Sequence, residues 1–299
     1  MKQSLLPYVV ITPAHNEEAF IERTIHSIIN QTVRPLKWIV VNDNSTDRTR
    51  EIVEQYAAHH DFLRLVNLRR SGERHFGNKV RAFNHGLTNT QLPDYQYIGN
   101  IDADISLEKD YFEKLLHEFD RDPNLGVAGG MVSTCIGDKF ISQEVALDSV
   151  AGAVQLFQRE CFEQIGGYRA LPLGGIDAAA EIMARMNGWK TRTFPELRVL
   201  EHRRTGSATA RPLAAKVKDG QRLHSLGFDF LFLCLRLVYR SIDRPIFIGS
   251  AATLYGYFKG VITRAPMVLS PDVVQYLRSE QRGKIMRFLR RSHSLQKNV

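Results

Sequence analysis

Residues 8–18 read YVVITPAHNEE, and this stretch decides the fold. The β-branched run Tyr8–Thr12 predicts a buried strand, and the polar residues after it predict a loop. Beyond the loop, isoleucines recur at positions 21, 25, 28 and 29, which is the spacing of one face of a helix. A strand followed closely by an amphipathic helix predicts the first half of a βαβ unit.

The same order of strand and helix continues through the first 120 residues. Strands are predicted at Leu36–Val41, Phe62–Asn67 and Tyr95–Ile101, and helices at Arg48–Ala58, Asn78–Leu87 and Lys109–Phe119. This alternation predicts an α/β fold with a mostly parallel sheet flanked by helices. Ligands of such sheets bind beyond the carboxyl ends of the strands, so polar residues at those ends are the candidates for chemistry.

The composition is that of a folded globular protein. The 299 residues are 43% apolar and 24% charged, which excludes collagen-like, low-complexity and wholly disordered chains. The three cysteines are far apart and form no CxxC pair, so a reduced compartment is expected and a zinc site is not. The first residues reach Glu17 and Glu18 too early for a signal peptide, which favours a cytoplasmic protein.

Charge is distributed unevenly along the chain. Residues 201–299 hold 18 Lys and Arg against 6 Asp and Glu, a net charge of +12, whereas residues 1–200 carry a net charge of −4. A basic C-terminal part favours an anionic partner such as a membrane surface, a nucleic acid or a phosphate-rich ligand. The alternative is a basic face that only contacts solvent.

The composition and the hydrophobic pattern of the sequence change after about Thr205. We predict a sheet domain over residues 1–205 and a basic helical extension over residues 206–299. The apolar stretches Leu226–Tyr239 and Pro245–Phe258 are shorter than the about 18–20 uncharged residues of a spanning helix. Two interpretations remain: helices that cover the sheet, or amphipathic helices lying in a membrane interface. The second is favoured, and it predicts peripheral attachment to the inner face of the plasma membrane.

Polar residues follow three of the predicted strands. These are Thr12–Glu18, Asn42–Asp47 and Asp102–Asp104. Each segment alone is typical of a turn or a helix cap. Because the carboxyl ends of parallel strands meet at one edge, the three together predict a binding site.

These motifs resemble those of family 2 glycosyltransferases with the GT-A fold. The resemblance runs through VVITPAHNEE, IVVNDNSTDRT, GNKVRAFNHGL, YIGNIDADIS and CFEQIGGYRALPLGGIDAAAEIMARMNGWK, and it ends near VLEHRRTG. It covers roughly the first two-thirds of the chain. It implies a Rossmann-like GT-A domain that binds a nucleotide-sugar donor, of the type found in bacterial surface-polysaccharide synthesis, followed here by a C-terminal helical extension.

The resemblance also implies a bound divalent cation. Asp102-Ala103-Asp104 is similar to the family's DXD motif, which makes Asp104 a direct metal ligand and gives Asp102 a contact to the metal or the ribose. Hard oxygen ligands suit Mg²⁺ or Mn²⁺, which stabilise a departing diphosphate as Lewis acids. His202 follows the last predicted strand, where relatives have a histidine that contacts metal or diphosphate. Its alternative is an ordinary surface histidine.

Further donor contacts are implied by position in the motifs. The residues concerned are Pro13, His15 and Glu17 at base and ribose, Asp43 at the base, and Lys79 and Arg203 near the phosphates. For Lys79 the alternative is a solvated helix cation. The stretch Arg203–Ala215 has several small residues and is a candidate lid over the donor.

The general base is assigned to Asp177. The family keeps an acidic pair before a helix, and Gly174-Gly175-Ile176-Asp177 occupies that place here. The chain departs from the family's pattern because Ile176 replaces the first acid and Ala179 a further one. Glu181 lies one turn on and is the alternative base. A helix cap is the structural alternative for Asp177, and it is compatible with catalysis.

The function expected is therefore that of a metal-dependent inverting glycosyltransferase. It would move a sugar to the hydroxyl of a glycan or lipid-linked acceptor in polysaccharide or glycolipid assembly. One alternative is transfer onto a polyprenyl phosphate, which needs no base. A nucleotidyltransferase is disfavoured because the loop after the first strand is not glycine-rich. A nucleic-acid-binding module ranks last, since no aromatic residues interleave with the cations.

Overall fold

The computed structural model describes residues 7–69, 77–88, 91–92, 94–136, 139–142, 146–203, 212–239 and 247–296. The chain divides into two compact units. One comprises residues 1–172 and 176–205 and contains the sheet, and the other comprises residues 173–175 and 206–299 and is helical in its described part. Residues 204–211 of the candidate lid lie outside the described residues.

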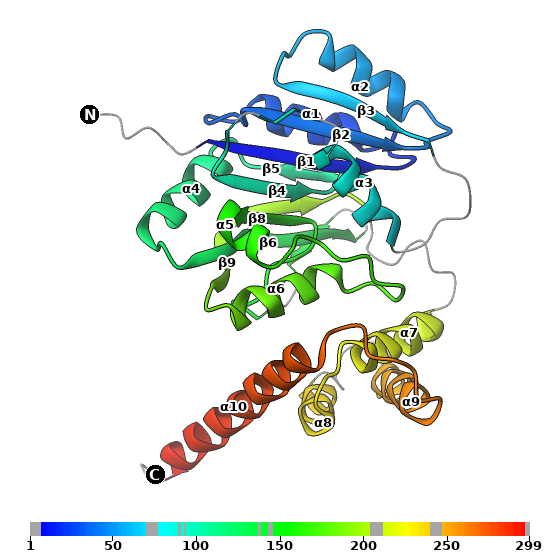
Figure 1. Cartoon of the computed structure of the whole chain (residues 1–299), viewed down its shortest axis with the longest axis vertical. Coiled ribbons are helices and arrows are strands. Elements are labelled where there is room, and N and C mark those ends of the chain that lie inside the picture. Colours follow the sequence, from blue (N-terminus) through cyan, green and yellow to red (C-terminus); the bar gives the residue numbers. More distant parts are fainter. Residues whose placement is uncertain are drawn as a thin grey trace. The chain divides into compact units, whose positions relative to one another are not determined.

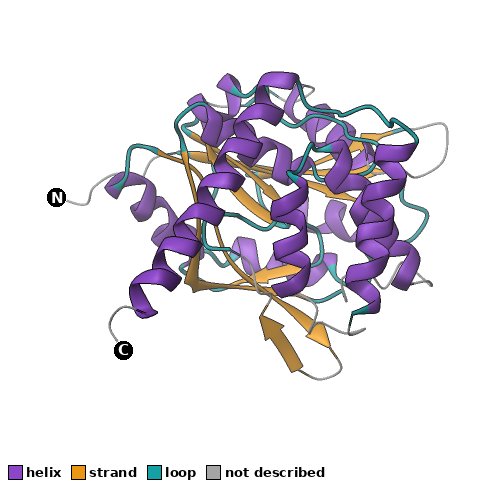
Figure 2. Cartoon of the chain, turned by 90° about the horizontal axis from the view of Figure 1, so that it is seen from below, coloured by secondary structure: helices purple, strands orange, loops and turns teal. Residues whose placement is uncertain are grey.

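The strands of the first unit are β1 (Tyr8–Ala14), β2 (Lys37–Asp43), β3 (Leu63–Leu68), β4 (Tyr97–Ile101), β5 (Ile105–Leu107), β6 (Leu125–Ile136), β7 (Lys139–Ser142), β8 (Val154–Gln158) and β9 (Lys190–Glu201). Within the described residues they form one sheet in the order β3–β2–β1–β4–β8–β6–β9–β5, with β7 paired to β6 (Figure 1). The first four of this order pair in parallel, as do β6 and β9, and the others are antiparallel. The strands change direction across the sheet in Figure 2, which is the expected twist.

The helices of the first unit are α1 (Ile21–Ile29), α2 (Thr49–Ala57), α3 (Gly77–Thr88), α4 (Tyr111–Arg121), α5 (Arg159–Gln164) and α6 (Ile176–Met186). The predicted α/β fold, with its mostly parallel sheet, flanking helices and C-terminal helices, is confirmed. All strands and helices expected over the first 121 residues are present, and their bounds differ from the prediction by a few residues. The antiparallel strands β5, β7 and β8 were not predicted.

Both faces of the central strands are covered. Val10, Trp38 and Val40 belong to one core, together with Ile25 of α1. On the other face, α3 approaches so closely that a Cβ atom on Gly86 would lie 2.8 Å from a methyl group of Val41 and 3.1 Å from one of Ile11. Burial on both faces explains why these strands are continuous apolar runs without a polar face. Polar side chains are therefore left to the strand ends.

The first helix is fixed to the turn after β4. The Thr24 hydroxyl of α1 lies 2.9 Å from the carbonyl oxygen of Ala103 and 2.7 Å from that of Ile105. Thr24 is fully buried, so its hydroxyl needs a partner inside the protein. This contact positions the segment Asp102–Asp104 relative to α1.

The second unit contains α7 (Pro212–Ser225), α8 (Phe230–Tyr239), α9 (Ile248–Ile262) and α10 (Pro271–Gln296). Helices α7 and α9 pack through glycines, since a Cβ atom on Gly220 would lie 1.9 Å from the Thr253 carbonyl oxygen and one on Gly256 would lie 2.0 Å from that of Val217. An ion pair of 2.9 Å between Arg282 and Asp229 joins α10 to the start of α8. Among the described helices, none combines the length and the hydrophobicity that crossing a bilayer requires.

Candidate functional site

The loops after β1 and β2 are bound to each other. His15 Nδ1 lies 2.6 Å from the carbonyl oxygen of Asp43, and the Thr46 amide donates to Asn16 Oδ1 over 2.8 Å. Asn16 and Asn44 have φ values of 55° and 56°, a left-handed conformation that asparagine tolerates better than most residues. Pro13 lies beside Val41 in the parallel register, so both loops leave the same edge of the sheet. The structure thus brings Pro13, His15 and Asp43 together.

A cation just after β9 joins the first loop to the segment after β4. The guanidinium of Arg203 forms an ion pair with Glu17, and its Nε atom lies 3.3 Å from Asp104 Oδ2. The guanidinium also stacks over the ring of Phe20, 5.3 Å from the ring centre. Three predicted site residues from separate segments, Glu17, Asp104 and Arg203, therefore lie together.

Acidic charge exceeds basic charge around Asp104. Burial raises the pKa of the Asp104 carboxyl to about 7, with further contributions from Asp102, Glu17 and Glu201, and Arg203 opposes this rise only in part. The side chain of Asp104 is 13% exposed. A poorly hydrated carboxyl surrounded by other carboxylates favours binding of an additional cation.

Unfilled hydrogen-bonding capacity lies in the same region. The buried atom Asn100 Oδ1 has no hydrogen-bond partner among the described residues. Asn100 is the penultimate residue of β4, two positions before Asp102. Buried polar atoms are seldom left unpaired, so this oxygen indicates room for a polar ligand or water.

The carboxylates fit a hard cation, but His202 does not. Its Nε2 atom lies 2.6 Å from the Ser106 hydroxyl and its Nδ1 atom 3.2 Å from a terminal nitrogen of Arg23. Burial and Arg23 lower the pKa of His202. Across the described ranges, no three His, Cys, Asp or Glu side chains converge as ligands of one metal ion. Asp104 and Asp102 remain the candidates, on the chemistry of their oxygen donors and the excess negative charge.

Lys79 points into the site from the first turn of α3. Its Nζ atom lies 2.5 Å from Asp102 Oδ1 and donates to the carbonyl oxygen of Gly152 over 3.0 Å. The side-chain amide of Asn100 donates to the same carbonyl oxygen over 2.8 Å. Lys79 is therefore a half-buried cation paired with Asp102 rather than a solvated helix residue.

Asp177 lies next to this cluster. It occupies the first turn of α6, and a Cβ atom on Gly152 would come within 2.7 Å of Asp177 Oδ2. The Gly152 backbone thus separates the Asp177 carboxylate from Lys79. Helix N-termini interact favourably with negative charge, so the start of α6 is a suitable place for a carboxylate.

Glu181 plays a different part from Asp177. It is 2% exposed, and its Oε1 atom accepts hydrogen bonds of 2.9 Å from the Val150 amide and from the side chain of Gln155. Burial raises the pKa of Glu181 to about 7. Glu181 holds the segment that leads to Gly152, so its position does not favour it as the alternative base.

Sequence reasoning missed Gly152 and Asn100. Neither residue carries reactive chemistry; Gly152 lies outside the motifs quoted above, and Asn100 lies within YIGNIDADIS but was given no role there. Their importance comes from contacts between segments far apart in the chain, which no local pattern reveals. The clustering of Asn100 with Asp102 on one strand end was the only available signal.

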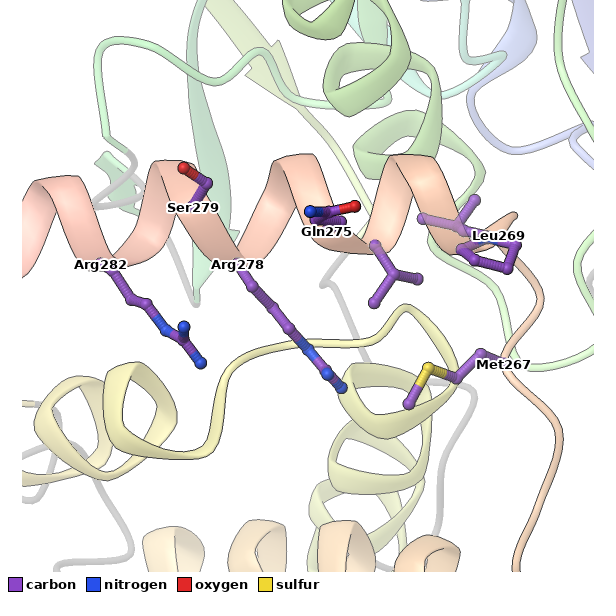
Figure 3. A pocket seen from close by; sticks show the side chains of 8 residues that line it. Met267, Leu269, Gln275, Arg278, Ser279 and Arg282 are labelled. Atoms are coloured by element: carbon purple, nitrogen blue, oxygen red, sulfur yellow. The ribbon is translucent and has the colours of Figure 1, made fainter.

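A large cavity lies in the helical unit. It has a volume of about 820 Å³ and is lined by Met267, Leu269, Pro271, Val274, Gln275, Arg278, Ser279 and Arg282. Figure 3 shows Arg278 and Arg282 extending from the same side of α10. None of the lining residues is a predicted site residue.

Charged groups gather at the carboxyl ends of β1, β2 and β4, where open α/β sheets bind their ligands. Residues 9–170 match the profile described as glycosyl transferase family 2, and the chain belongs to that family. The family resemblance read from the motifs is therefore confirmed.

Solved structures share the fold. A mannosyltransferase of Pyrobaculum calidifontis, solved with GDP-Man and Mn²⁺, superposes with a TM-score of 0.54 at 19% identity over 91% of this chain and 78% of its own. GalNAc-T7, solved with UDP, GalNAc and Mn²⁺, gives a TM-score of 0.58 at 15% identity over 87% of this chain and 57% of its own. At such identities the likeness concerns the fold alone.

Several bacterial proteins are similar in sequence over part of the chain. Chondroitin synthase of Escherichia coli is 31% identical over 116 residues, which are 39% of this chain and 16% of that protein. The putative teichuronic acid biosynthesis glycosyltransferase TuaG of Bacillus subtilis is 36% identical over 107 residues, 36% of this chain and 39% of its own. The chain thus covers well under half of the length of these relatives.

Proposed function

We propose that the chain is a metal-dependent inverting glycosyltransferase that moves a sugar from a nucleotide-sugar donor to an acceptor hydroxyl. One observation carries this proposal: Glu17, Asp104 and Arg203 meet at the strand ends, beside the Lys79–Asp102 pair. Membership of glycosyl transferase family 2 supports the reaction class. Residues 1–205 would form the catalytic domain.

The donor would lie across the ends of β1, β2 and β4. Pro13, His15 and Asp43 would contact base and ribose, because the His15–Asp43 contact joins the two loops there. Lys79 and Arg203 are the cations that would bind the diphosphate oxygens. Each now pairs with a carboxylate, so donor binding would require them to exchange one anionic partner for another.

A divalent cation, Mg²⁺ or Mn²⁺, would be held by Asp104 together with Asp102. When bound, it supplies Lewis-acid stabilisation of the negative charge on the departing diphosphate. The surroundings of Asp104 support this role, because the neighbouring carboxylates that contribute to its raised pKa also attract a metal ion. Glu17 is part of the acidic surroundings and is kept in place by Arg203.

Asp177 would act as the general base. Its carboxylate takes the proton of the acceptor hydroxyl while the oxygen attacks the anomeric carbon. The bond between that carbon and the phosphate oxygen breaks, and its electron pair leaves with the nucleoside diphosphate. A single displacement inverts the configuration at the anomeric carbon. The position of Asp177 beside Gly152, close to the Lys79–Asp102 pair, supports this role.

The acceptor would be a glycan or a lipid-linked glycan. Relatives named as chondroitin synthase and as a poly-beta-1,6-N-acetyl-D-glucosamine synthase support a role in bacterial surface polysaccharide assembly. The net charge of +12 over residues 201–299 supports an anionic membrane surface as partner. The protein would then act in the cytoplasm, at the inner face of the plasma membrane, with residues 206–299 as its attachment.

The proposal is tested by thermal unfolding with nucleoside diphosphates and nucleotide sugars, each with and without Mn²⁺. A ligand at one hundred times its dissociation constant adds about 2.7 kcal/mol to the free energy of unfolding. The Asp104→Asn variant should lose the part of the shift that depends on Mn²⁺. No shift with any nucleotide, or an unchanged metal response in the variant, would contradict the proposal.

A further inference from the structure

Helix α9 buries mostly small residues and exposes most of its large apolar residues. Its buried face carries Gly249, Thr253, Gly256, Tyr257 and Gly260, of which only Tyr257 is large. Its exposed face carries Ile248, Tyr255 and Ile262, which are 57%, 62% and 78% exposed. A surface helix of a water-soluble protein has the opposite arrangement, with apolar residues facing the core.

Helix α8 also exposes large apolar residues, although it buries Leu233. Leu231, Leu235 and Val238 recur at the spacing of one helix face and are 57%, 46% and 71% exposed. The rings of Phe230 and Phe258 lie 5.4 Å apart, so the exposed faces of α8 and α9 adjoin. We call the exposed side chains of Leu231, Leu235, Val238, Ile248, Tyr255, Phe258, Val261 and Ile262 the apolar stripe.

The packing of α9 against α7 resembles helix packing in lipid. Gly256 and Gly260 form a GxxxG spacing, and α9 approaches α7 so closely that a Cβ atom on Gly256 would clash with backbone. In lipid, helices associate through small residues and turn large apolar residues outward. In water, an exposed apolar face of this size usually marks a contact surface.

The length of α9 decides how it would meet a bilayer. Its 15 residues rise by about 22 Å, which is less than the about 30 Å of a hydrocarbon core. A helix of this length with one apolar face lies in the plane of the interface and does not cross the membrane.

Charge identifies which surface covers the stripe. Lys259 lies within the exposed face of α9, and Arg264 follows the helix; both are exposed. The final described turns of α10 combine the exposed apolar residues Met286 and Leu289 with further Lys and Arg. Cations beside an apolar face are complementary to the phosphates of anionic lipids, and they would repel a second copy of the same basic surface.

We infer that the apolar stripe inserts into the interface of an anionic bilayer, with α8 and α9 lying in its plane. The inference rests on the proposed function for its biological setting, since it deepens the membrane partner named there. It adds that attachment is by insertion of apolar side chains and not by surface charge alone.

Flotation of the full-length protein with vesicles tests this inference. Vesicles of phosphatidylcholine alone are compared with vesicles that also contain phosphatidylglycerol. The variant carrying Tyr255→Asp and Ile262→Asp should lose about tenfold or more of its partition onto the anionic vesicles, because burying each such side chain stabilises by more than about 1.4 kcal/mol. The control carries Leu36→Asp and Leu147→Asp, which replaces exposed apolar residues of the sheet unit and should bind as the native protein does.

Three outcomes would overturn the inference. The first is that the stripe variant partitions onto vesicles as the native protein does, while the double variant Lys259→Gln, Arg264→Gln does not bind or about 0.5 M salt abolishes binding. That result would show that the attachment depends on surface charge alone. Another is a dimer in light scattering that the stripe variant abolishes, without vesicle binding, which indicates a second copy. The last is an absence of partition by the native protein. Far-UV circular dichroism checks folding, and nucleotide binding by the same proteins separates failure here from failure of the proposed function.

Discussion

The carboxylate of Asp177 lies against Gly152, with no room for a side chain between them. A Cβ atom on Gly152 would come within 2.7 Å of Asp177 Oδ2 and 3.0 Å of its Cβ and Cγ atoms. The carbonyl oxygen of the same glycine accepts a hydrogen bond from Lys79. One glycine therefore spaces the proposed base from the proposed diphosphate-binding cation.

Replacement of Gly152 by alanine should move Asp177 and slow turnover. The added methyl group meets Asp177 at less than the usual contact distance, so the carboxylate must shift. Misplacement of a catalytic group by about 1 Å costs about one hundredfold in rate. We expect a lower kcat with unchanged nucleotide affinity, measured by steady-state kinetics and calorimetry.

Gly283→Ala is the matched control. Gly283 lies in α10 with no atom within 4 Å of a built Cβ, so the same change there should leave kcat unaltered. A native kcat in Gly152→Ala would show that Asp177 does not need its present position.

Exchange of Asp177 for asparagine should separate the two acids of α6. The amide of asparagine cannot take the proton from the hydroxyl of the sugar acceptor. We therefore expect a loss of at least about one hundredfold in kcat with little change in the KM for the donor. Glu181→Gln keeps an acceptor oxygen for the Val150 amide and should retain most activity. Native activity in Asp177→Asn would instead favour transfer onto a polyprenyl phosphate, an acceptor that needs no base.

Much of the fold could be predicted because it depends on local patterns. The runs Tyr8–Thr12 and Trp38–Val41 are buried on both faces, so their hydrophobicity is continuous and easily read. The spacing of Ile21, Ile25 and Ile28 follows one helix face, and all three are fully buried. Of the antiparallel strands, β5 was missed because it has only three residues, and β7 because it is exposed along its whole length.

The candidate site could be predicted only at positions where the type of residue itself indicates a chemical role. Asp43, Asp102 and Asp104 follow apolar strands, and parallel pairing brings such ends together. The roles of Gly152 and Glu181 depend on which distant segments pack against them, and no spacing in the sequence encodes that. His202 was placed correctly at the end of a strand, but the direction of its ring is set by Ser106 and Arg23.

Removal of the Lys79 charge should weaken donor binding. Lys79→Gln loses a charged group that we expect at the diphosphate, where such a hydrogen bond contributes about 1.5–3 kcal/mol. The donor dissociation constant should rise by about tenfold or more, as measured by calorimetry. Lys190→Gln, which breaks an exposed pair with Asp122, should have no effect. If both variants bind the donor equally well, Lys79 does not contact it.

The raised pKa of Asp104 should make the fold less stable as the pH rises. Between the ordinary carboxyl pKa of 3.8 and the folded value of about 7, the folded protein keeps a proton that the unfolded chain has lost. The folded state therefore binds more protons in this window, so the free energy of unfolding falls as the pH increases. The expected loss from this group is on the order of 3 kcal/mol between pH 4 and pH 8.

Chemical denaturation of native protein and Asp104→Asn at these two pH values, in the presence of a chelator, measures the effect. In Asp104→Asn, the free energy of unfolding should fall less between the two pH values than in the native protein. The remaining fall is due to Glu181, whose pKa is also raised to about 7. Asp122→Asn is the control. Lys190 lowers the pKa of Asp122, so this carboxylate has the opposite effect on how the free energy of unfolding depends on pH. Added Mn²⁺ should restore stability most strongly above pH 7, where no proton competes for Asp104. Equal pH dependence in native protein and Asp104→Asn would place the excess negative charge elsewhere.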